Sequence, residues 1–262
     1  MSIYDTHAHP NLEPLLIKTD EIIKDCKEND LYLNVVGTDL ISSAKAISLA
    51  KKYPKWLKAC IAIHPNDVQN FDFEKSKEAL MSMCKENLNH IVAIGECGLD
   101  FYYTTQYKKL QYEYLIMQMD IAVNFNLPLM LHVRNAYKEI IDFLKTYKPN
   151  VPIIIHCFSG NLEDANALLK LKNEFKIFLS IPGIVTFKNA INLQKAIEVI
   201  PLENLLVETD SPWLAPMPFR GQENKPLYVK KTIEKIAQLK NLSYETIANC
   251  TFKNASQLFL KI

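Results

Sequence analysis

Residues 1–9 read MSIYDTHAH, a short run of strand-forming residues that ends in two histidines, His7 and His9. Successive side chains of a β-strand point to opposite faces, so residues two apart share a face. The two imidazoles are therefore predicted to reach toward one point in space. This pattern, a strand that ends in metal-binding residue types, recurs along the chain and decides the predicted fold.

Strand-forming runs alternate with longer amphipathic stretches over the whole chain. We predict eight strands, at residues 2–6, 31–37, 57–63, 91–95, 128–133, 153–156, 176–181 and 205–209. Helical patterns include residues 78–86, 107–124, 136–146, 162–171 and 187–199, followed by a pair at 226–240 and 244–260. The repeat of roughly 25 to 35 residues is that of a βα unit. We predict an α/β fold, a (β/α)8 TIM barrel forming a single domain over residues 1–262, with a doubly wound open sheet as the alternative.

Composition narrows the class of protein. Charges nearly balance, with 30 Lys and Arg against 29 Asp and Glu, which argues against a general electrostatic attraction to nucleic acid or membranes. No apolar run approaches the length of a membrane span, and the first residues lack the pattern of a signal peptide. The six cysteines form no CxxC motif and are typical of reduced thiols. We therefore expect a cytoplasmic monomer without a membrane segment.

Residues of metal-binding type follow six of the eight predicted strands. They are His7 and His9, His64, Glu96, His132, His156 and Asp210, which account for every histidine except His90. The carboxyl ends of the strands meet on one face of a TIM barrel, so these residues are predicted to converge. Either neighbouring cysteine, Cys97 or Cys157, is expected to point away as a packed thiol, because adjacent strand residues face opposite sides.

The predicted ligand set is His7, His9, Glu96, His132, His156 and Asp210. Imidazole nitrogens together with carboxylate oxygens suit Zn²⁺, Mn²⁺, Fe²⁺ or Ni²⁺. Six protein ligands are too many for one catalytic ion that keeps an open position, so we predict two divalent ions that share a carboxylate. Asp210 could also orient an attacking water and accept its proton. A helix cap is the structural alternative for this segment, with Ser211 in that role.

The chain contains only two arginines, Arg134 and Arg220, and both stand beside predicted site residues. Guanidinium groups bind phosphate or carboxylate through two parallel hydrogen bonds, which Lys cannot do. Both are candidate substrate contacts, and ion pairs with Asp100 or Glu208 are the structural alternative. Nearby aromatic residues could stack on bases, but we favour packing roles for all of them: Phe101, Tyr102, Tyr103, Phe158 and Trp213.

Seven segments occur in order between residues 5 and 226: DTHAH, AIHP, GECGLDFY, PLMLHVR, HCFSG, ETDSPWL and RGQENKP. With them the chain resembles the TatD family of metal-dependent hydrolases, within the amidohydrolase-like barrel superfamily. The resemblance implies one metal ion on His7, His9, Glu96 and Asp210 and a second on Glu96, His132 and His156. It places His64 beside the substrate, and Arg220 and Asn224 in a substrate loop. The implied ions are Zn²⁺, Mg²⁺ or Mn²⁺.

The implied activity is hydrolysis of DNA phosphodiesters, typically as a 3′→5′ exonuclease. Some family members are instead linked to D-aminoacyl-tRNA esters, so a tRNA ester is the alternative substrate. An amidohydrolase for a small cyclic amide and a metal-binding protein without activity are further alternatives. Two positions depart from the family pattern: Glu223 stands where a basic residue is common, and Cys97 stands where an aliphatic residue is common.

Overall fold

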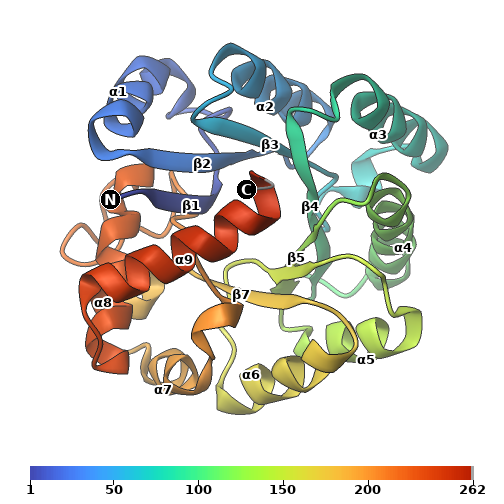
Figure 1. The fold of residues 1–262 in the computed structure, drawn as a ribbon. Coiled ribbons are helices and arrows are strands. Elements are labelled where there is room, and N and C mark those ends of the chain that lie inside the picture. Colours follow the sequence, from blue (N-terminus) through green and yellow to red (C-terminus); the bar gives the residue numbers. More distant parts are fainter. Residues whose placement is uncertain (261–262) are drawn as a thin grey trace.

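The computed structural model describes residues 1–260 and contains eight parallel strands that follow one another around a barrel (Figure 1). The strands are β1 Ile3–Ala8, β2 Leu31–Val36, β3 Leu57–Ile61, β4 Ile91–Asp100, β5 Leu129–Arg134, β6 Ile153–Ile155, β7 Ile177–Ile181 and β8 Leu205–Val207. Each strand pairs in parallel with its neighbour in the chain. The prediction of a (β/α)8 barrel is confirmed, and residues 261–262 of the predicted domain lie outside the described residues.

Nine helices surround the strands in the described part of the chain. They are α1 Thr19–Asn29, α2 Leu40–Lys52, α3 Phe73–Asn87, α4 Lys108–Phe125, α5 Tyr137–Tyr147, α6 Leu162–Leu169, α7 Ile191–Val199, α8 Val229–Lys240 and α9 Tyr244–Phe259. Four begin at a side chain that accepts a hydrogen bond from the first turn, which satisfies backbone donors left open there: Asp39, Asp72, Asn161 and Ser243. Within residues 1–260, no helix combines the length and apolar character needed to cross a bilayer.

Two element boundaries differ from the prediction in ways that affect the site. Strand β4 continues to Asp100 because its second half pairs with β5, as far as Asp100 opposite Arg134. The segment after β8 does not start a helix at Ser211, since the next helical turn begins only at Pro226. The predicted cap at Ser211 is therefore wrong. Residues 211–225 instead form a long loop over the carboxyl end of the barrel.

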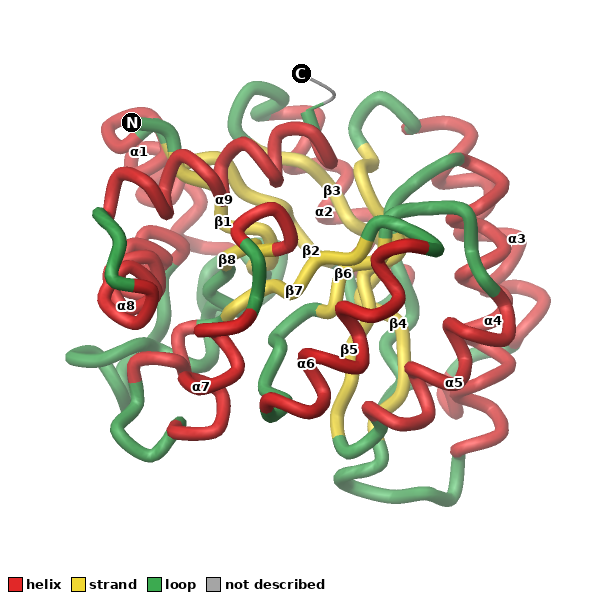
Figure 2. The backbone as a smooth tube through the Cα atoms, turned by 60° about the horizontal axis from the view of Figure 1, so that its bottom comes forward, coloured by secondary structure: helices red, strands yellow, loops and turns green. Residues whose placement is uncertain are grey.

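The barrel interior is filled by one ring of side chains that α9 closes from one end. Every strand contributes at least one buried residue to this cluster: Tyr4, Val36, Cys60, Val92 with Ala93, Met130, Ile154, Phe178 and Leu206. Helix α9 adds Ala255 and Phe259, and it crosses this end of the barrel in both views (Figures 1 and 2). Burial of a Phe side chain contributes roughly 1.5–3 kcal/mol. The plugged end leaves the opposite, carboxyl end of the strands for chemistry.

The barrel closes where β1 meets the segment after β8. The backbone N–H of Asp210 donates to the carbonyl of His7 at 2.9 Å, and the N–H of His9 donates to the carbonyl of Ser211 at 2.8 Å. These hydrogen bonds continue the parallel pairing beyond the end of β8. The closing seam therefore passes through three of the predicted metal ligands.

Candidate metal centre

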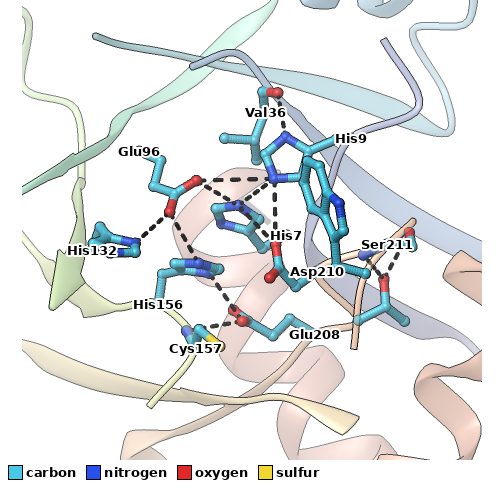
Figure 3. Close-up of polar contacts among 12 residues, drawn as sticks. His7, His9, Val36, Glu96, His132, His156, Cys157, Glu208, Asp210 and Ser211 are labelled. Atoms are coloured by element: carbon cyan, nitrogen blue, oxygen red, sulfur yellow. Dashed lines mark hydrogen bonds and ion pairs between the residues drawn. The ribbon is translucent and has the colours of Figure 1, made fainter. Parts of the chain in front are cut away.

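Glu96 lies at the middle of a cluster of imidazoles at the carboxyl end of the barrel (Figure 3). Its Oε2 atom is 3.3 Å from His7 Nε2 and 3.9 Å from His9 Nε2. Its Oε1 atom is 2.7 Å from His132 Nδ1 and 3.3 Å from His156 Nε2. The two oxygens of one carboxylate thus face two different pairs of histidines.

The first pair, His7 and His9, converges with Asp210. The two Nε2 atoms are 3.1 Å apart, and Asp210 Oδ1 lies 3.3 Å from His9 Nε2 and 3.8 Å from His7 Nε2. The backbone of Asp210 is left-handed, with φ of 58°, a conformation that few residues other than Gly, Asn and Asp adopt readily. This local turn directs the carboxylate back over the end of the barrel instead of along the strand.

His7 and His9 each contact a second group through Nδ1, the ring nitrogen that faces away from Glu96. These contacts orient the two rings. His9 Nδ1 lies 2.9 Å from the Val36 carbonyl, which can only accept, so Nδ1 carries the proton and the Nε2 lone pair faces the cluster. His7 Nδ1 lies 3.1 Å from the Met130 sulfur, a member of the barrel's interior ring. The floor of the metal centre is therefore the top of the hydrophobic core.

In the second pair, His132 and His156, the ring nitrogen that faces away from Glu96 lies next to another carboxylate. We expected these carboxylates, Asp100 and Glu208, only as alternative partners for the arginines. Asp100 Oδ2 lies 3.1 Å from His132 Nε2, and Glu208 Oε1 lies 2.9 Å from His156 Nδ1. The Glu208 contact has the geometry of an ion pair without an aligned hydrogen bond. The signal that could have found them is position, because each stands at a strand end and two or four residues from a predicted ligand.

The electrostatics of the cluster favour ionised carboxylates. Burial alone would raise the pKa of Glu96, but the facing imidazoles of His156 and His64 outweigh it and hold the pKa well below its ordinary value. Burial also opposes ionisation of Asp210, yet the neighbouring histidines, among them His9 with Nε2 at 3.3 Å, lower its pKa. For His7, burial and the neighbouring His156 lower the pKa. The carboxylates and His7 thus have the charge state that a cation requires. Facing carboxylates instead outweigh burial and raise the pKa of His132 and His156, so an ion bound by these two rings would displace protons.

These donors fit divalent metal ions. Ligand atoms of His7, His9 and Asp210 all lie within 4.8 Å of one another, and so do those of His64, Glu96 and His132. Nitrogen and carboxylate donors held by rigid strand ends match first-row divalent metals. The structure brings together all six residues of the predicted ligand set.

A family model described as TatD related DNase matches residues 4–260 of this chain. The chain belongs to the TatD family. An uncharacterized metal-dependent hydrolase of Mycoplasma genitalium is 48% identical over 260 residues, with 99% of each chain covered. The uncharacterized metal-dependent hydrolase YabD of Bacillus subtilis is 37% identical, with 98% of each chain covered. The crystal structure of YJJV, a TatD homolog from Escherichia coli, matches with a TM-score of 0.90 at 26% identity over 98% of both chains.

The resemblance drawn from the sequence motifs is therefore confirmed, and both of the sequence relatives named above are described as metal-dependent hydrolases. His64 lies inside this TatD centre, with Nε2 3.3 Å from Glu96 Oε1. Its Nδ1 accepts a hydrogen bond from the backbone N–H of Asn66 at 3.1 Å. A neutral ring held in this way carries its proton on Nε2. His64 can therefore donate a hydrogen bond into the site.

The two arginines lie against aromatic rings at the rim of the TatD site. The guanidinium carbon of Arg134 is 3.8 Å from the centre of the Tyr102 ring, and that of Arg220 is 4.4 Å from the centre of the Phe187 ring. Neither arginine forms an ion pair with Asp100 or Glu208 among residues 1–260, since those carboxylates face histidines instead. Stacking leaves the N–H edges of both guanidinium groups open to a ligand.

Aromatic side chains at the rim divide into two groups. Phe158 is buried and Phe101 packs against the hydrophobic core, as expected. Tyr102, Tyr103 and Trp213 are instead 56%, 69% and 49% exposed, so they do not pack in the core. They pack locally: the Tyr102 ring contacts Tyr103, and the Trp213 ring lies 5.0 Å from that of His9. They stand on loops beyond the strand ends, where the core no longer reaches them.

Asn224 and Glu223 occupy unlike positions in the loop after β8. Asn224 is buried, and its side-chain amide donates to the carbonyls of Thr209 and Trp213 at 2.9 and 2.6 Å. Its amide is thus committed to holding the loop and is not available to contact a substrate. Glu223 accepts two hydrogen bonds from Lys18, at 2.7 and 2.9 Å. A lysine from the loop after β1 therefore neutralises the unusual acid of this TatD chain.

Of the two cysteines beside ligands, one behaves as expected and the other does not. Cys97 is buried and its thiol lies 3.8 Å from the Met130 carbonyl. The sulfur of Cys157 lies within 4.8 Å of ligand atoms of His156 and Asp210, so the expectation that it points away is wrong. Strand β6 ends at Ile155 and Cys157 has φ of 46°, so strand alternation does not apply there. Burial and the nearby carboxylates of Asp210 and Glu208 raise the pKa of its thiol, which disfavours the thiolate that binds metals.

Proposed function

We propose that this TatD chain is a divalent-metal-dependent deoxyribonuclease of the 3′→5′ exonuclease type. The observation that carries the proposal is the division of the Glu96 carboxylate between two pairs of histidines. Oε2 faces His7 and His9, while Oε1 faces His132 and His156. This is the arrangement expected of a carboxylate that bridges two ions, and two-metal sites recur in phosphodiester hydrolysis.

One ion would be held by His7, His9, Glu96 and Asp210, and the other by Glu96, His132 and His156. The ions would be Zn²⁺, Mg²⁺ or Mn²⁺; the histidine-rich donor set favours Zn²⁺ or Mn²⁺ over Mg²⁺. When bound, they supply Lewis acidity and allow a water to act as a nucleophile near neutral pH.

The protein's own residues orient the water and the leaving group. The Asp210 side chain is 15% exposed, and its carboxylate is held ionised, so it can orient the attacking water and accept a proton from it. His64 carries a proton on the nitrogen that faces the cluster, and it can donate this proton toward an oxygen of the substrate or of the leaving group. The proton donor follows β3 and the proton acceptor follows β8, so the two groups come from different strand ends.

A phosphodiester fits the basic groups at the rim. A pocket of about 410 Å³ lies between the segments that follow β4, β5 and β6, and Tyr102, Arg134, Tyr137 and Ser159 are among the residues that line it. None of the predicted metal ligands lines this pocket. This volume is within the usual range for small-ligand sites. Arg134 is the last residue of β5 and Arg220 stands in the loop after β8, so we propose that they contact phosphates on either side of the scissile bond.

Removal and return of metal test the centre directly. Protein treated with a chelator should lose its hydrolytic activity, and reconstitution should restore it with two divalent ions per chain. Elemental analysis after removal of loosely bound Zn²⁺ or Mn²⁺ gives the stoichiometry. Protein that binds no ion after reconstitution would contradict the proposed centre.

A substrate panel tests the choice of DNA. The metal-loaded protein should shorten single- or double-stranded DNA from the 3′ end, and should act more slowly on RNA, D-aminoacyl-tRNA and small cyclic amides. End-labelled oligonucleotides distinguish exonuclease from endonuclease products. Rapid hydrolysis of the tRNA ester without any cleavage of DNA would replace this proposal by the deacylase alternative.

Arg220→Lys should weaken cleavage of DNA by on the order of 10- to 100-fold in kcat/KM, because Lys keeps the charge but loses the fork of two N–H groups. The range corresponds to roughly 1.5–3 kcal/mol for hydrogen bonds to charged groups. Metal content should not change. An uncharged ester substrate is the matched control, and its hydrolysis should be nearly unaffected. Equal losses on both substrates would show that Arg220 only supports the loop through Phe187.

A further inference from the structure

We propose that Asp100 and Glu208 are positioning residues for the second metal site, where they orient His132 and His156 and supply negative charge that this site lacks in its direct ligands. The inference rests on the two-metal function proposed above. It is drawn from a difference between the two histidine pairs in the groups that contact the ring nitrogens facing away from Glu96.

Asp100 is a fixed acceptor behind His132. Its side chain is completely buried, and Oδ2 lies 3.1 Å from His132 Nε2. The same oxygen accepts a hydrogen bond from Asn66 Nδ2 at 2.9 Å, and Oδ1 accepts one from the backbone N–H of Tyr102 at 2.9 Å. The Asp100 carboxylate is thus held by two donors, one in the loop after β3 and one in the loop after β4. An acceptor fixed in this way sets both the orientation of the ring and the nitrogen that carries the proton.

Glu208 stands behind His156 in a less satisfied position. Oε1 lies 2.9 Å from His156 Nδ1 and accepts a hydrogen bond from the backbone N–H of Cys157 at 2.8 Å. Oε2 is buried and has no hydrogen-bond partner among the described residues. A buried carboxylate with a free oxygen is costly unless positive charge lies nearby. An imidazole that binds a cation through its other nitrogen would supply that charge.

Among the described residues, no carboxylate forms an ion pair or hydrogen bond with the outer ring nitrogens of the first pair, although a Glu208 oxygen lies within 4.8 Å of a His7 ring nitrogen. Val36 contributes a backbone carbonyl to His9, and Met130 contributes a thioether to His7, which is a weak acceptor. The first site has direct carboxylates from Glu96 and Asp210, whereas the second has only the shared Glu96. The carboxylates of Asp100 and Glu208 would therefore offset the positive charge of the second ion without binding it directly.

Metal binding, and not turnover, tests the inference. Metal-free protein is titrated with Co²⁺, whose visible absorption reports each occupied site, and His132→Ala identifies the band of the second site. Asp100→Asn and Glu208→Gln should each weaken the second site by on the order of 10- to 100-fold in Kd, which is the usual effect of removing an outer partner. The first site should bind as in the wild type.

Glu223→Gln is the matched control, because it also removes one negative charge at this end of the barrel but its partner is Lys18 and not an imidazole. It should bind both ions with wild-type affinity. Thermal unfolding of the metal-free variants checks the fold. If Asp100→Asn does not fold, Asn66→Ala removes only one of the bonds that fix Asp100 and should weaken the second site to a smaller degree.

Wild-type affinity for both ions in Asp100→Asn and Glu208→Gln would overturn the inference, as would an equal loss at the two sites. These outcomes differ from a failure of the proposed function. If the wild type binds two ions but cleaves no DNA, and the two variants lose affinity only at the second site, the nuclease proposal fails. The role of Asp100 and Glu208 then remains in place.

Discussion

Glu96→Gln should remove nearly all hydrolytic activity while the barrel remains folded. The amide keeps the shape of the side chain, but it cannot supply negative charge to both pairs of histidines. We expect one of the two ions to be lost and kcat/KM to fall by on the order of 1000-fold or more, since the Lewis acidity of an ion contributes several kcal/mol. Elemental analysis and initial rates on DNA measure the two effects separately.

The fold of this variant is checked by circular dichroism and thermal unfolding of the metal-free proteins. Glu96 is buried among imidazoles, so the metal-free variant has fewer ion pairs than the metal-free wild type. We therefore expect a lower melting temperature for the variant, with the circular dichroism spectrum of the folded barrel retained. A variant that keeps both ions and full activity would show that Glu96 does not bridge, and the central argument for two metals would then fail.

Asp210→Asn should reduce kcat by roughly 10²- to 10⁴-fold, the usual contribution of a general acid or base. Asn tolerates the left-handed backbone at this position as Asp does, so the change removes charge without adding backbone strain. The first metal ion should also bind more weakly, because Asn is a poorer ligand than a carboxylate. Rates are therefore measured at saturating metal, where the remaining loss reports proton transfer and water orientation.

Asp142→Asn is a suitable control for Asp210→Asn, because Asp142 lies on the exposed side of α5 and pairs only with Lys138. It should retain wild-type kcat. If Asp210→Asn regained full kcat at saturating metal, Asp210 would be a ligand alone, and the proton acceptor would have to be sought elsewhere in the centre.

The repeating strand-end pattern explains why the fold could be predicted from the sequence. Histidines are rare in this chain, and five of six stand at the end of a predicted strand or within three residues after it. A parallel barrel is the architecture that brings such distant residues to one face. Strand alternation also placed His7 and His9 on a common side, and the structure brings their Nε2 atoms to 3.1 Å.

What could not be predicted depends on backbone geometry beyond the strand ends. Cys157 turns into the centre because its left-handed conformation breaks the alternation. Asp100 belongs to β4 only because that strand pairs further with β5. Exposure of Tyr102 and burial of Asn224 follow from how long loops fold over the rim, and residue spacing carries no information on this.

The seam between β1 and the segment after β8 has a consequence for synthesis of the chain. His7 and His9 precede Asp210 and the last strand by about 200 residues in the chain. During translation these two histidines are therefore made long before Asp210, and until then the hydrogen bond from the Asp210 N–H to the His7 carbonyl cannot form. An interrupted polypeptide that lacks β8 has neither a closed barrel nor a complete first site.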